Sequence, residues 1–212
     1  MSRPKYIPST DLPYHITARS HNKDAFRLPP ELMWPLVCDE LTRLHFIHDF
    51  QILSFVLMPN HFHMITVTPK ANLPEGMHSF MTHVSKQINA MTGNLNQNFG
   101  ARHFRCLMTS HHYLLNAYKY VYRNPVKAGL CRRVEDYRYS SLQMYLGLQP
   151  IAYPLSEDCT LMNDIDSTLA WLNKTHSNSQ WKDIRIALKH SEFKLPRKGG
   201  NKEPNELESF LL

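Results

Sequence analysis

The sequence predicts an α+β fold in which helices pack against an antiparallel β-sheet. Short β-prone runs alternate with longer runs whose apolar residues recur at helical spacing, and two β-prone runs are joined directly by a Pro-Asn turn. Read in order, the segments are β-α-β-β-α-β-α, which is the split βαβ, ferredoxin-like arrangement with a final helix appended. We expect helices on one face of the sheet, then the appended helix and a C-terminal extension.

The first two elements follow a lead-in that is rich in proline. The run from Tyr14 to Ala18 is short and β-branched, which predicts the first strand. Pro29 and Pro30 suit the start of a helix, and apolar residues recur at roughly helical spacing from there to Phe46. A strand followed by a long helix is therefore expected.

A hairpin and a second helix come next. Residues 51–58 and 61–67 are apolar and β-prone, and Pro59-Asn60 between them predicts a tight turn. Apolar residues at helical spacing over 74–91 predict a helix that ends near Gly93.

The last elements of the core are a fourth strand, at 103–108, and a helix that starts at His111. Ser110 is the candidate N-cap of this helix, and the Asn124-Pro125 pair is expected to end it. Past Pro150 the pattern weakens, with helices expected at 161–172 and 181–188 and a disordered, mostly basic tail, KLPRKGGNKEPN.

Length and composition indicate one core with an appendage. The chain has 212 residues, 42% of them hydrophobic and 20% charged, and a formal net charge of +6. We therefore expect a core domain over residues 1–149 and a C-terminal extension over 150–212 that is partly helical. The positive charge suits a polyanionic partner such as nucleic acid, although many basic proteins bind none.

Cysteine spacing and hydropathy indicate a reduced compartment. The four cysteines are far apart and form no CxxC pair, which argues against a zinc knuckle or a disulfide framework. No apolar run approaches the roughly 18 residues of a membrane-spanning helix, and the N-terminus has no apolar signal region. The expectation is a soluble, cytoplasmic protein that contacts no membrane.

The hairpin contains a pair of histidines in MPNHFHMITV. His61 and His63 are separated by one residue, and successive side chains of a strand alternate between faces, so both imidazoles point to the same side. Taken alone, the pair fits a partly exposed polar face better than a metal site.

The appended helix supplies a phenol and an amide. Tyr120 and Asn124 are four residues apart, so they share a face of the helix. If this face lies near His61 and His63, the set resembles three ligands of a divalent metal beside a nucleophile. Imidazole and amide oxygen suit Mn²⁺, or Mg²⁺ with retained waters, better than a closed zinc site.

Four motifs together resemble a known family. YHITAR, MPNHFHM, YVYRNPVKAGL and EDYRYSSL, in this order between Tyr14 and Leu146, are similar to the single-tyrosine HUH transposases of the insertion-sequence-200-like group, and most of all to REP-associated tyrosine transposases. HxH alone is weak, but the four pieces in this order and spacing are specific. The resemblance implies the same ferredoxin-like fold and makes residues 1–149 the catalytic domain.

The resemblance also implies a chemistry and its residues. His61 and His63 would bind the metal, Asn124 would be the third ligand, and Tyr120 would be the catalytic nucleophile. The implied reaction is nicking and strand transfer of single-stranded or hairpin DNA through a 5′-phosphotyrosine, with Mg²⁺ or Mn²⁺ and without a nucleotide cofactor. The chain has no phosphate-binding GxxxxGK[ST] loop. Family members act as monomers or homodimers.

Two basic groups are candidate DNA contacts. Lys119, Arg123 and Lys127 form an i, i+4, i+8 stripe on the appended helix, which is either a solvated face or a phosphate-binding face. Arg102 and Arg105 flank the region of Phe104 and could grip a strand, unless Phe104 is simply a core residue.

Two other classes of protein share parts of this pattern. A two-histidine phosphoesterase needs two HxT or HxS signatures on strands, and His83-Val84-Ser85, the best partner for His15-Ile16-Thr17, falls on an expected helix. A nucleic-acid-binding module without catalysis has no need of the tyrosine, asparagine and histidine set. A domesticated descendant of a transposase would keep that set, so the sequence does not separate a domesticated protein from an active transposase.

Overall fold

The computed structural model describes residues 5–95, 97–156, 161, 164–197 and 205–208. Its sheet has four strands in the order β2-β3-β1-β4, and every pairing is antiparallel. The strands are β1 (Tyr14–Arg19), β2 (Gln51–Met58), β3 (His61–Val67) and β4 (Phe104–Leu107). The strand order and the alternation with helices confirm the ferredoxin-like α+β fold.

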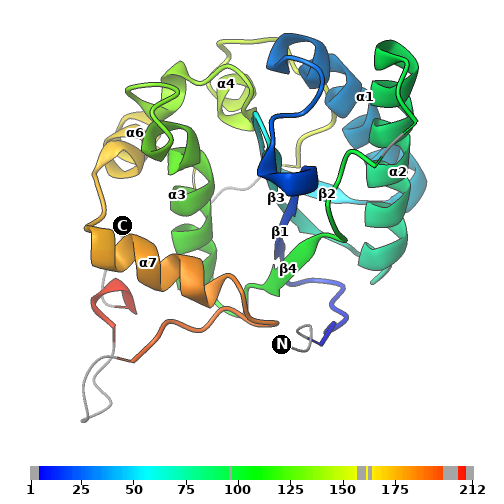
Figure 1. The fold of residues 1–212 in the computed structure, drawn as a ribbon. Coiled ribbons are helices and arrows are strands. Elements are labelled where there is room, and N and C mark those ends of the chain that lie inside the picture. Colours follow the sequence, from blue (N-terminus) through cyan, green and yellow to red (C-terminus); the bar gives the residue numbers. More distant parts are fainter. Residues whose placement is uncertain (1–4, 96, 157–160, 162–163, 198–204, 209–212) are drawn as a thin grey trace.

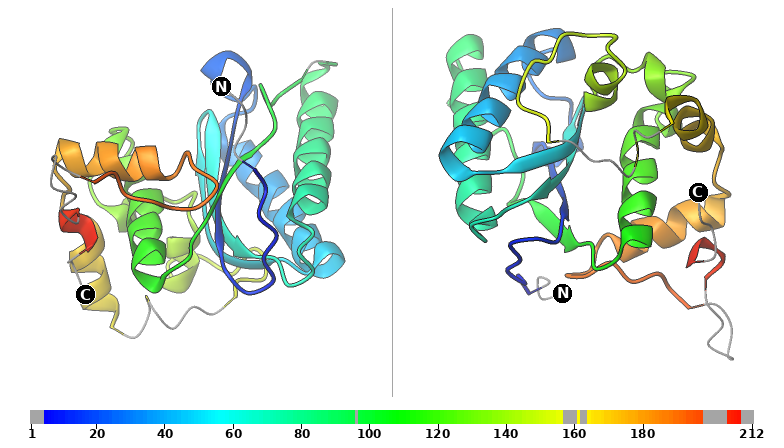
Figure 2. Two further views of the ribbon diagram at one scale, coloured as in Figure 1. Left: turned by 90° about the horizontal axis from the view of Figure 1, so that it is seen from below. Right: turned by 180° about the vertical axis from the view of Figure 1, so that it is seen from behind.

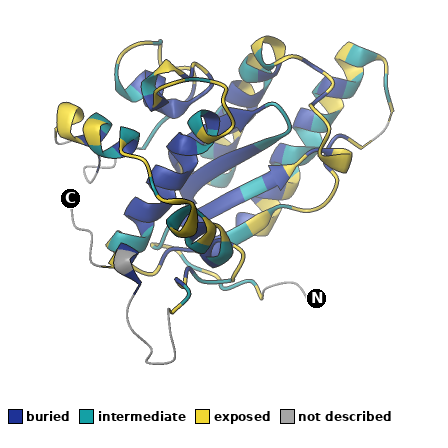
Figure 3. Ribbon diagram, turned by 60° about the vertical axis from the view of Figure 1, so that its left-hand side comes forward, coloured by how far each residue is buried: buried dark blue, intermediate teal, exposed yellow. Residues whose placement is uncertain are grey.

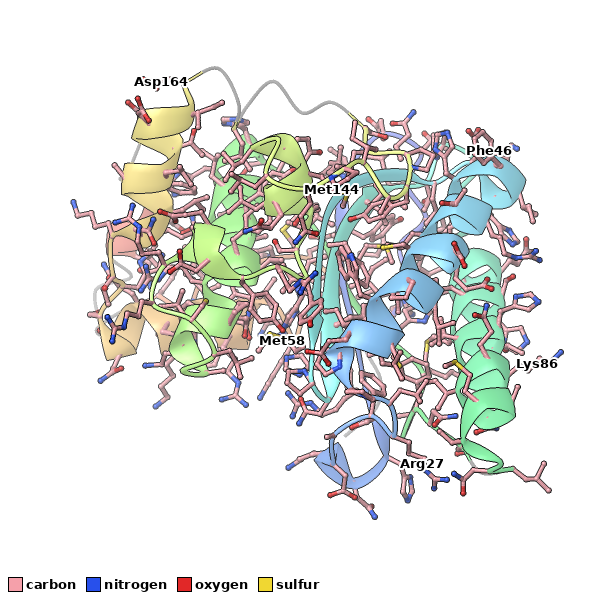
Figure 4. The ribbon with its side chains drawn as sticks, turned by 90° about the horizontal axis from the view of Figure 1, so that it is seen from above. Arg27, Phe46, Met58, Lys86, Met144 and Asp164 are labelled. Carbon is pink, nitrogen blue, oxygen red and sulfur yellow. The ribbon has the colours of Figure 1, made fainter. Side chains whose placement is uncertain are left out.

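The helices lie in two layers, one on each face of the sheet (Figures 1 and 2). They are α1 (Pro30–His48), α2 (Leu73–Thr92), α3 (His111–Lys127), α4 (Ser141–Tyr145), α6 (Ile165–Asn173) and α7 (Asn178–Ala187). Helices α1 and α2 cover one face, and α3, α4, α6 and α7 lie on the other side (Figure 4). The expectation of helices on one face holds for α1 and α2, but α3 buries the second face.

The core between the sheet and the α1-α2 layer is aromatic. Phe62 of β3 stacks on Phe55 of β2 with ring centroids 5.5 Å apart and meets Phe80 of α2 edge-on at 5.4 Å. Ile16 of β1 is fully buried on the same face. Because both faces of the sheet are covered, most strand residues are buried, as Figure 3 shows.

Two of the predicted helix ends are confirmed. Gly93 follows α2 in the left-handed conformation, with φ of 68°, where a side chain would be strained. The Ser110 side chain caps α3 by accepting a hydrogen bond from the backbone N–H of Tyr113 at 3.2 Å.

The predicted end of α3 at Asn124-Pro125 is wrong, because the helix continues to Lys127. Proline lacks the N–H of a regular helical turn but its fixed φ is compatible with a helix. The turn is held by other bonds: the Asn124 side chain donates to the carbonyl of Tyr120 at 2.7 Å, and the Ala128 N–H donates to the Asn124 carbonyl at 2.9 Å.

Segments outside the four strands pair with both edges of the sheet. The Leu57 N–H of β2 donates to the carbonyl of Tyr139 at 3.0 Å, and the Tyr137 hydroxyl donates to the carbonyl of Leu57 at 2.7 Å. At the β4 edge, the Leu107 N–H donates to the carbonyl of Ser191 at 2.9 Å. Paired edges remove the exposed N–H and C=O groups through which sheets aggregate.

The C-terminal extension contains α6 and α7, close to where helices were expected. Within the described residues, no helix has the length and apolar character needed to cross a membrane. The basic tail expected at 194–205 lies largely outside the described residues, since 198–204 are not among them.

A close contact of α2 with Phe50, just before β2, and with Leu44 of α1 predicts the effect of one substitution. A Cβ on Gly76 would lie 2.4 Å from Cε2 of the buried Phe50 ring and 3.3 Å from Cδ2 of Leu44. Gly76→Ala should therefore lower the free energy of unfolding by about 1–3 kcal/mol through overpacking, although alanine improves helix propensity by about 1 kcal/mol. Urea unfolding measures the change.

The control for this prediction is the double variant with Phe50→Leu. Removing the aromatic ring should make Gly76→Ala less costly in that background than in the wild type, because the two sites touch. A stabilised Gly76→Ala single variant would contradict the close packing.

Candidate active site

The candidate site lies on the face of the two central strands that α3 covers. Antiparallel register pairs Thr17 of β1 with His63 of β3, and Arg19 with His61. Side chains of paired residues share a face of the sheet. His15, two residues before Thr17, joins this polar face, and its partner in register is Ile65. The two predicted histidines are thus accompanied by a third.

The three imidazoles form a chain of ring contacts. The His61 and His63 ring centroids are 4.9 Å apart, and those of His15 and His63 are 5.1 Å apart. The Nε2 of His15 is 2.9 Å from the Nδ1 of His63, and the Nδ1 of His61 is 2.6 Å from the Oδ1 of Asn60. The Nε2 of His63 is buried and has no hydrogen-bond partner.

Burial keeps these imidazoles neutral. Desolvation, followed by repulsion from His61, lowers the pKa of His15 to about 3. Desolvation and Arg19 lower the pKa of His61 to about 4, and the pKa of His63 is also well below its usual value, first through desolvation and then through His15 and His61. A neutral imidazole is the form that binds a metal ion.

Helix α3 directs one of its tyrosines at the histidines. The Tyr120 ring meets His63 edge-on with centroids 5.5 Å apart and His15 at 6.1 Å. Tyr118 and Tyr122 stack on each other with centroids 6.2 Å apart, and the Tyr122 hydroxyl is 3.0 Å from the Ser141 Oγ. Residues two apart on a helix point about 200° from each other, so Tyr120 faces away from its two neighbours.

Tyr120 is a buried phenol. Only 8% of the residue is exposed. Desolvation raises its pKa, while Arg185, a hydrogen bond from the Asn124 side chain and Arg19 act in the opposite direction. The phenol is therefore protonated at neutral pH and needs activation before it can act as a nucleophile.

Asn124 is next to Tyr120 on α3, as the four-residue spacing predicts. Its Nδ2 donates to the Tyr120 carbonyl, which leaves Oδ1 as the atom that could bind a cation. Among the residues that the structure describes, no group of three or more His, Cys, Asp or Glu side chains is arranged to hold a metal ion. The predicted ligand set contains two histidines, His61 and His63, and its third member is the amide of Asn124.

The residues fit a divalent ion in one specific respect. A buried ring nitrogen without a partner, as at Nε2 of His63, is costly unless a ligand occupies it. His61 has its Nδ1 engaged by Asn60, so its Nε2 is the nitrogen left for a ligand.

The C-terminal extension closes over the tyrosine. The Trp181 ring of α7 stacks on Tyr120 with centroids 4.8 Å apart, and Arg185 is on the same helix. Sequence reasoning singled out neither Trp181 nor Arg19 as a site residue. No sequence signal links Trp181 to Tyr120, because the two lie far apart along the chain.

His15 is a further site residue that the motifs do not identify, although it carries a signal. Tyr14, Ile16 and Ala18 alternate with His15, Thr17 and Arg19 in β1, and this alternation predicts a polar face on that strand. In the sequence, His15 is part of the YHITAR motif and of an HxT signature, but the transposase resemblance gave it no role. The partner signature at His83 lies on α2, as predicted, on the other side of the sheet.

The basic stripe of α3 faces the C-terminal extension. Arg123 donates to the carbonyls of Leu172 and Asn173 at 3.0 and 2.6 Å. These carbonyls are in the last turn of α6, where a helix has no N–H groups of its own to pair with them. Lys119 is buried with its Nζ 4.9 Å from the centroid of the Trp171 ring. Lys127 Nζ donates to Asn178 Oδ1 at 3.0 Å. A DNA contact of Lys119 or Arg123 stays a prediction that requires α6 to move.

Arg102 and Arg105 line a groove on the opposite side of the sheet from Tyr120. The groove, of about 850 Å³, runs between α2 and a segment made of Leu95 and residues 97–105, and its described lining contains no acidic side chain. Its cationic side chains are Lys86, Arg102 and Arg105. His78 and His103 also line it, and burial, followed by the charges of Arg105 and Arg102, lowers the pKa of His103 to about 4.

Phe104 is next to Arg105 in β4 but points to the other face of the sheet. It is opposite Thr17 in register, so it shares the face of the histidines, and it is 55% exposed. Arg105, the next residue, is opposite Ile16, with its guanidinium 5.1 Å from the centroid of the Tyr6 ring. Phe104 is therefore a surface residue and not part of the core.

Comparison with known proteins gives a structural match and no sequence match. No family model and no curated protein matches the chain. The structure of a REP-associated tyrosine transposase bound to a REP hairpin is similar with a TM-score of 0.57 and 23% identity, over 76% of this chain and 94% of that one. The chain has the fold of that transposase, as the motif resemblance implied.

A second solved structure is more distant. It is a candidate transposase from Deinococcus radiodurans R1, with a TM-score of 0.40 and 14% identity, over 57% of this chain and 95% of that one. A likeness at this level supports no conclusion about the function of this chain.

The stacking of Trp181 on Tyr120 predicts a change in reactivity. Trp181→Ala should expose the phenol and raise the rate of Tyr120 nitration by tetranitromethane several-fold, as followed by peptide mapping. Trp171→Ala is the matched control, since Trp171 packs over Lys119 and not over Tyr120. Equal nitration of Tyr120 in both variants would contradict the shielding role of α7.

Proposed function

We propose that the protein is a metal-dependent DNA transposase or endonuclease that cleaves and rejoins single-stranded, hairpin or REP-like DNA through a 5′-phosphotyrosine. The observation that carries the proposal is the position of Tyr120. Of the three neighbouring tyrosines on α3, it alone meets His63, on a fold shared with a REP-associated tyrosine transposase.

In the proposed reaction, Tyr120 is the catalytic nucleophile. Its oxygen forms a bond to a backbone phosphorus, and the bond from that phosphorus to the 3′-oxygen breaks. The proton that the phenol loses balances the proton that the departing 3′-oxygen gains. Attack by a 3′-hydroxyl on the phosphotyrosine reverses the step and joins the strands. The phosphodiester energy is retained in the covalent link, so no nucleotide cofactor is needed.

The protein's residues would prepare this step in two ways. His61, His63 and Asn124 would hold a Mg²⁺ or Mn²⁺ ion, and the ion would polarise the phosphate and help to orient it. Arg19 and Arg185 favour the phenolate of Tyr120, because both lower its pKa against the effect of burial. At an ordinary tyrosine pKa only about one phenol in a thousand is ionised at pH 7, so this assistance matters.

The groove beside α2 is the proposed contact for the duplex part of a hairpin. It contains basic side chains and, among its described residues, no acidic one, and sequence-independent DNA affinity comes from such phosphate contacts. Phe104, which is exposed on the face of the histidines, would stack on a base of the single strand. We propose that the protein acts in the cytoplasm as a monomer or homodimer.

The alternative function is a single-stranded DNA- or RNA-binding protein, domesticated or non-catalytic. One observation favours it: Tyr120 is 8% exposed under Trp181, so little of the phenol is open to a substrate. The two functions differ in whether a covalent adduct forms.

The first test is formation of a covalent adduct on end-labelled hairpin DNA with a single-stranded flank, in Mn²⁺ or Mg²⁺. The wild type should form an adduct that peptide mapping places at Tyr120. Tyr120→Phe should abolish it, and His61→Ala should reduce it by at least about 100-fold, because removal of a nucleophile or of an electrostatic stabiliser costs factors of this order.

Tyr118→Phe is the matched control for the nucleophile, because it removes a phenolic hydroxyl from the opposite side of α3. This variant should still form the adduct. An adduct at Tyr118 or Tyr122 would overturn the role of Tyr120. DNA binding without an adduct under every ion and hairpin tried would favour the binding-only alternative.

The groove makes a separate prediction for DNA affinity. Lys86→Ala and Arg102→Ala should each weaken hairpin binding and lower the slope of log K against log salt by about one unit. Arg132→Ala, an exposed cation outside the groove, is the control and should leave the slope unchanged. Fluorescence anisotropy at several salt concentrations measures both, and equal slopes in all three variants would place the hairpin elsewhere.

A further inference from the structure

His15 is a buried histidine to which the proposed reaction gives no role. It lies in the central strand β1, is 2% exposed, and stacks on His63 with an interplanar angle of 25°. Its Nε2 is directed at the Nδ1 of His63, at a distance of 2.9 Å. A contact of this length between two ring nitrogens is a hydrogen bond and requires one proton between them.

Two arrangements of that proton are possible, with opposite consequences for His63. If His15 Nε2–H donates, His63 carries its own proton on Nε2, and that nitrogen is unable to bind a cation. If His63 Nδ1–H donates, Nε2 of His63 has a free lone pair. This is the same Nε2 that is buried without a protein partner.

His61 shows which arrangement a shared cation would require. Its Nδ1 lies 2.6 Å from the Oδ1 of Asn60, and an amide oxygen only accepts hydrogen bonds. His61 therefore carries its proton on Nδ1 and leaves Nε2 bare. When His63 donates to His15, both histidines of the pair have the same tautomer and both Nε2 atoms are available.

We propose that His15 is a positioning residue that accepts the Nδ1–H hydrogen bond of His63 and so keeps the Nε2 of His63 unprotonated for the divalent cation. The proposal rests on the proposed metal-dependent function. In most metal sites a carboxylate, backbone carbonyl or water accepts this bond. An imidazole can do so only in one tautomer, with its own proton on Nδ1.

His15 is better placed for this role than for direct ligation. Its Nε2 already faces His63 Nδ1, and the described residues contain no three-histidine arrangement suited to a metal ion. Its position in β1 also restrains it, because it lies beside β3 in the sheet and its ring meets the Tyr120 ring edge-on.

The test uses the full-length protein and has two readouts besides activity. Long-range ¹⁵N–¹H spectra of histidine-labelled, metal-free wild-type protein report the tautomer of each ring. The expected result is a proton on Nδ1 of His63 and of His15. A His63 ring protonated on Nε2 would overturn the proposal without any substitution.

Calorimetric titration with Mn²⁺ is the second readout. His15→Phe keeps a planar ring but has no acceptor, and it should weaken Mn²⁺ binding by about 10- to 100-fold, as loss of outer-shell partners does. His15→Gln keeps an acceptor and should stay within a few-fold of the wild type. Thermal unfolding of each variant checks the fold, and if His15→Phe does not fold, the wild-type tautomer decides alone.

His61→Ala separates failure of this inference from failure of the proposed function. It should abolish the Mn²⁺ site, because it removes a ligand. If His61→Ala binds Mn²⁺ as the wild type does, the metal site itself is wrong. If His61→Ala abolishes binding but His15→Phe retains it, the metal site stands and the positioning role of His15 is refuted.

Discussion

The packing of α3 against β2 and β3, with Tyr120 reaching His15 of β1, is the interaction on which the rest of the site depends. A ferredoxin-like sheet with helices on one face would leave His15, His61 and His63 in water, where they would be ordinary polar residues. Because α3 covers that face, His15 and His63 are only 2% and 4% exposed and their rings stay neutral. The same helix presents Tyr120 to them, so one packing contact sets both the burial of the histidines and the position of the proposed nucleophile.

This arrangement has a cost in stability. An unsatisfied buried polar group costs roughly 1–3 kcal/mol, and the Nε2 of His63 is such a group. The opposite face of the sheet offsets it with a well-packed aromatic core around Phe55, Phe62 and Phe80. Locally unfavourable groups supported by a stable scaffold are typical of functional sites. Here the polar site residues and the apolar core residues alternate along β1 and β3.

The C-terminal extension is part of the structure around the site. Arg123 binds the end of α6, Trp181 stacks on Tyr120, and residues 191–193 pair with the edge of β4. Lys119, Arg123 and Lys127, the basic stripe of α3, therefore hold α3 to α6 and α7. Because Trp181 stacks on Tyr120, the exposure of this phenol depends on the position of α7.

The sequence by itself determined the order of elements, most of their ends and the shared face of His61 and His63, because these depend on local periodicity and on capping residues such as Ser110 and Gly93. It also placed Tyr120 and Asn124 on one helix face. Only the tertiary structure decided that this face meets the histidines, that Trp181 covers Tyr120 and that Arg102 and Arg105 lie on the far side. The physical reason is that local patterns fix which way a side chain points within its own element, whereas contacts between distant segments depend on how whole layers pack.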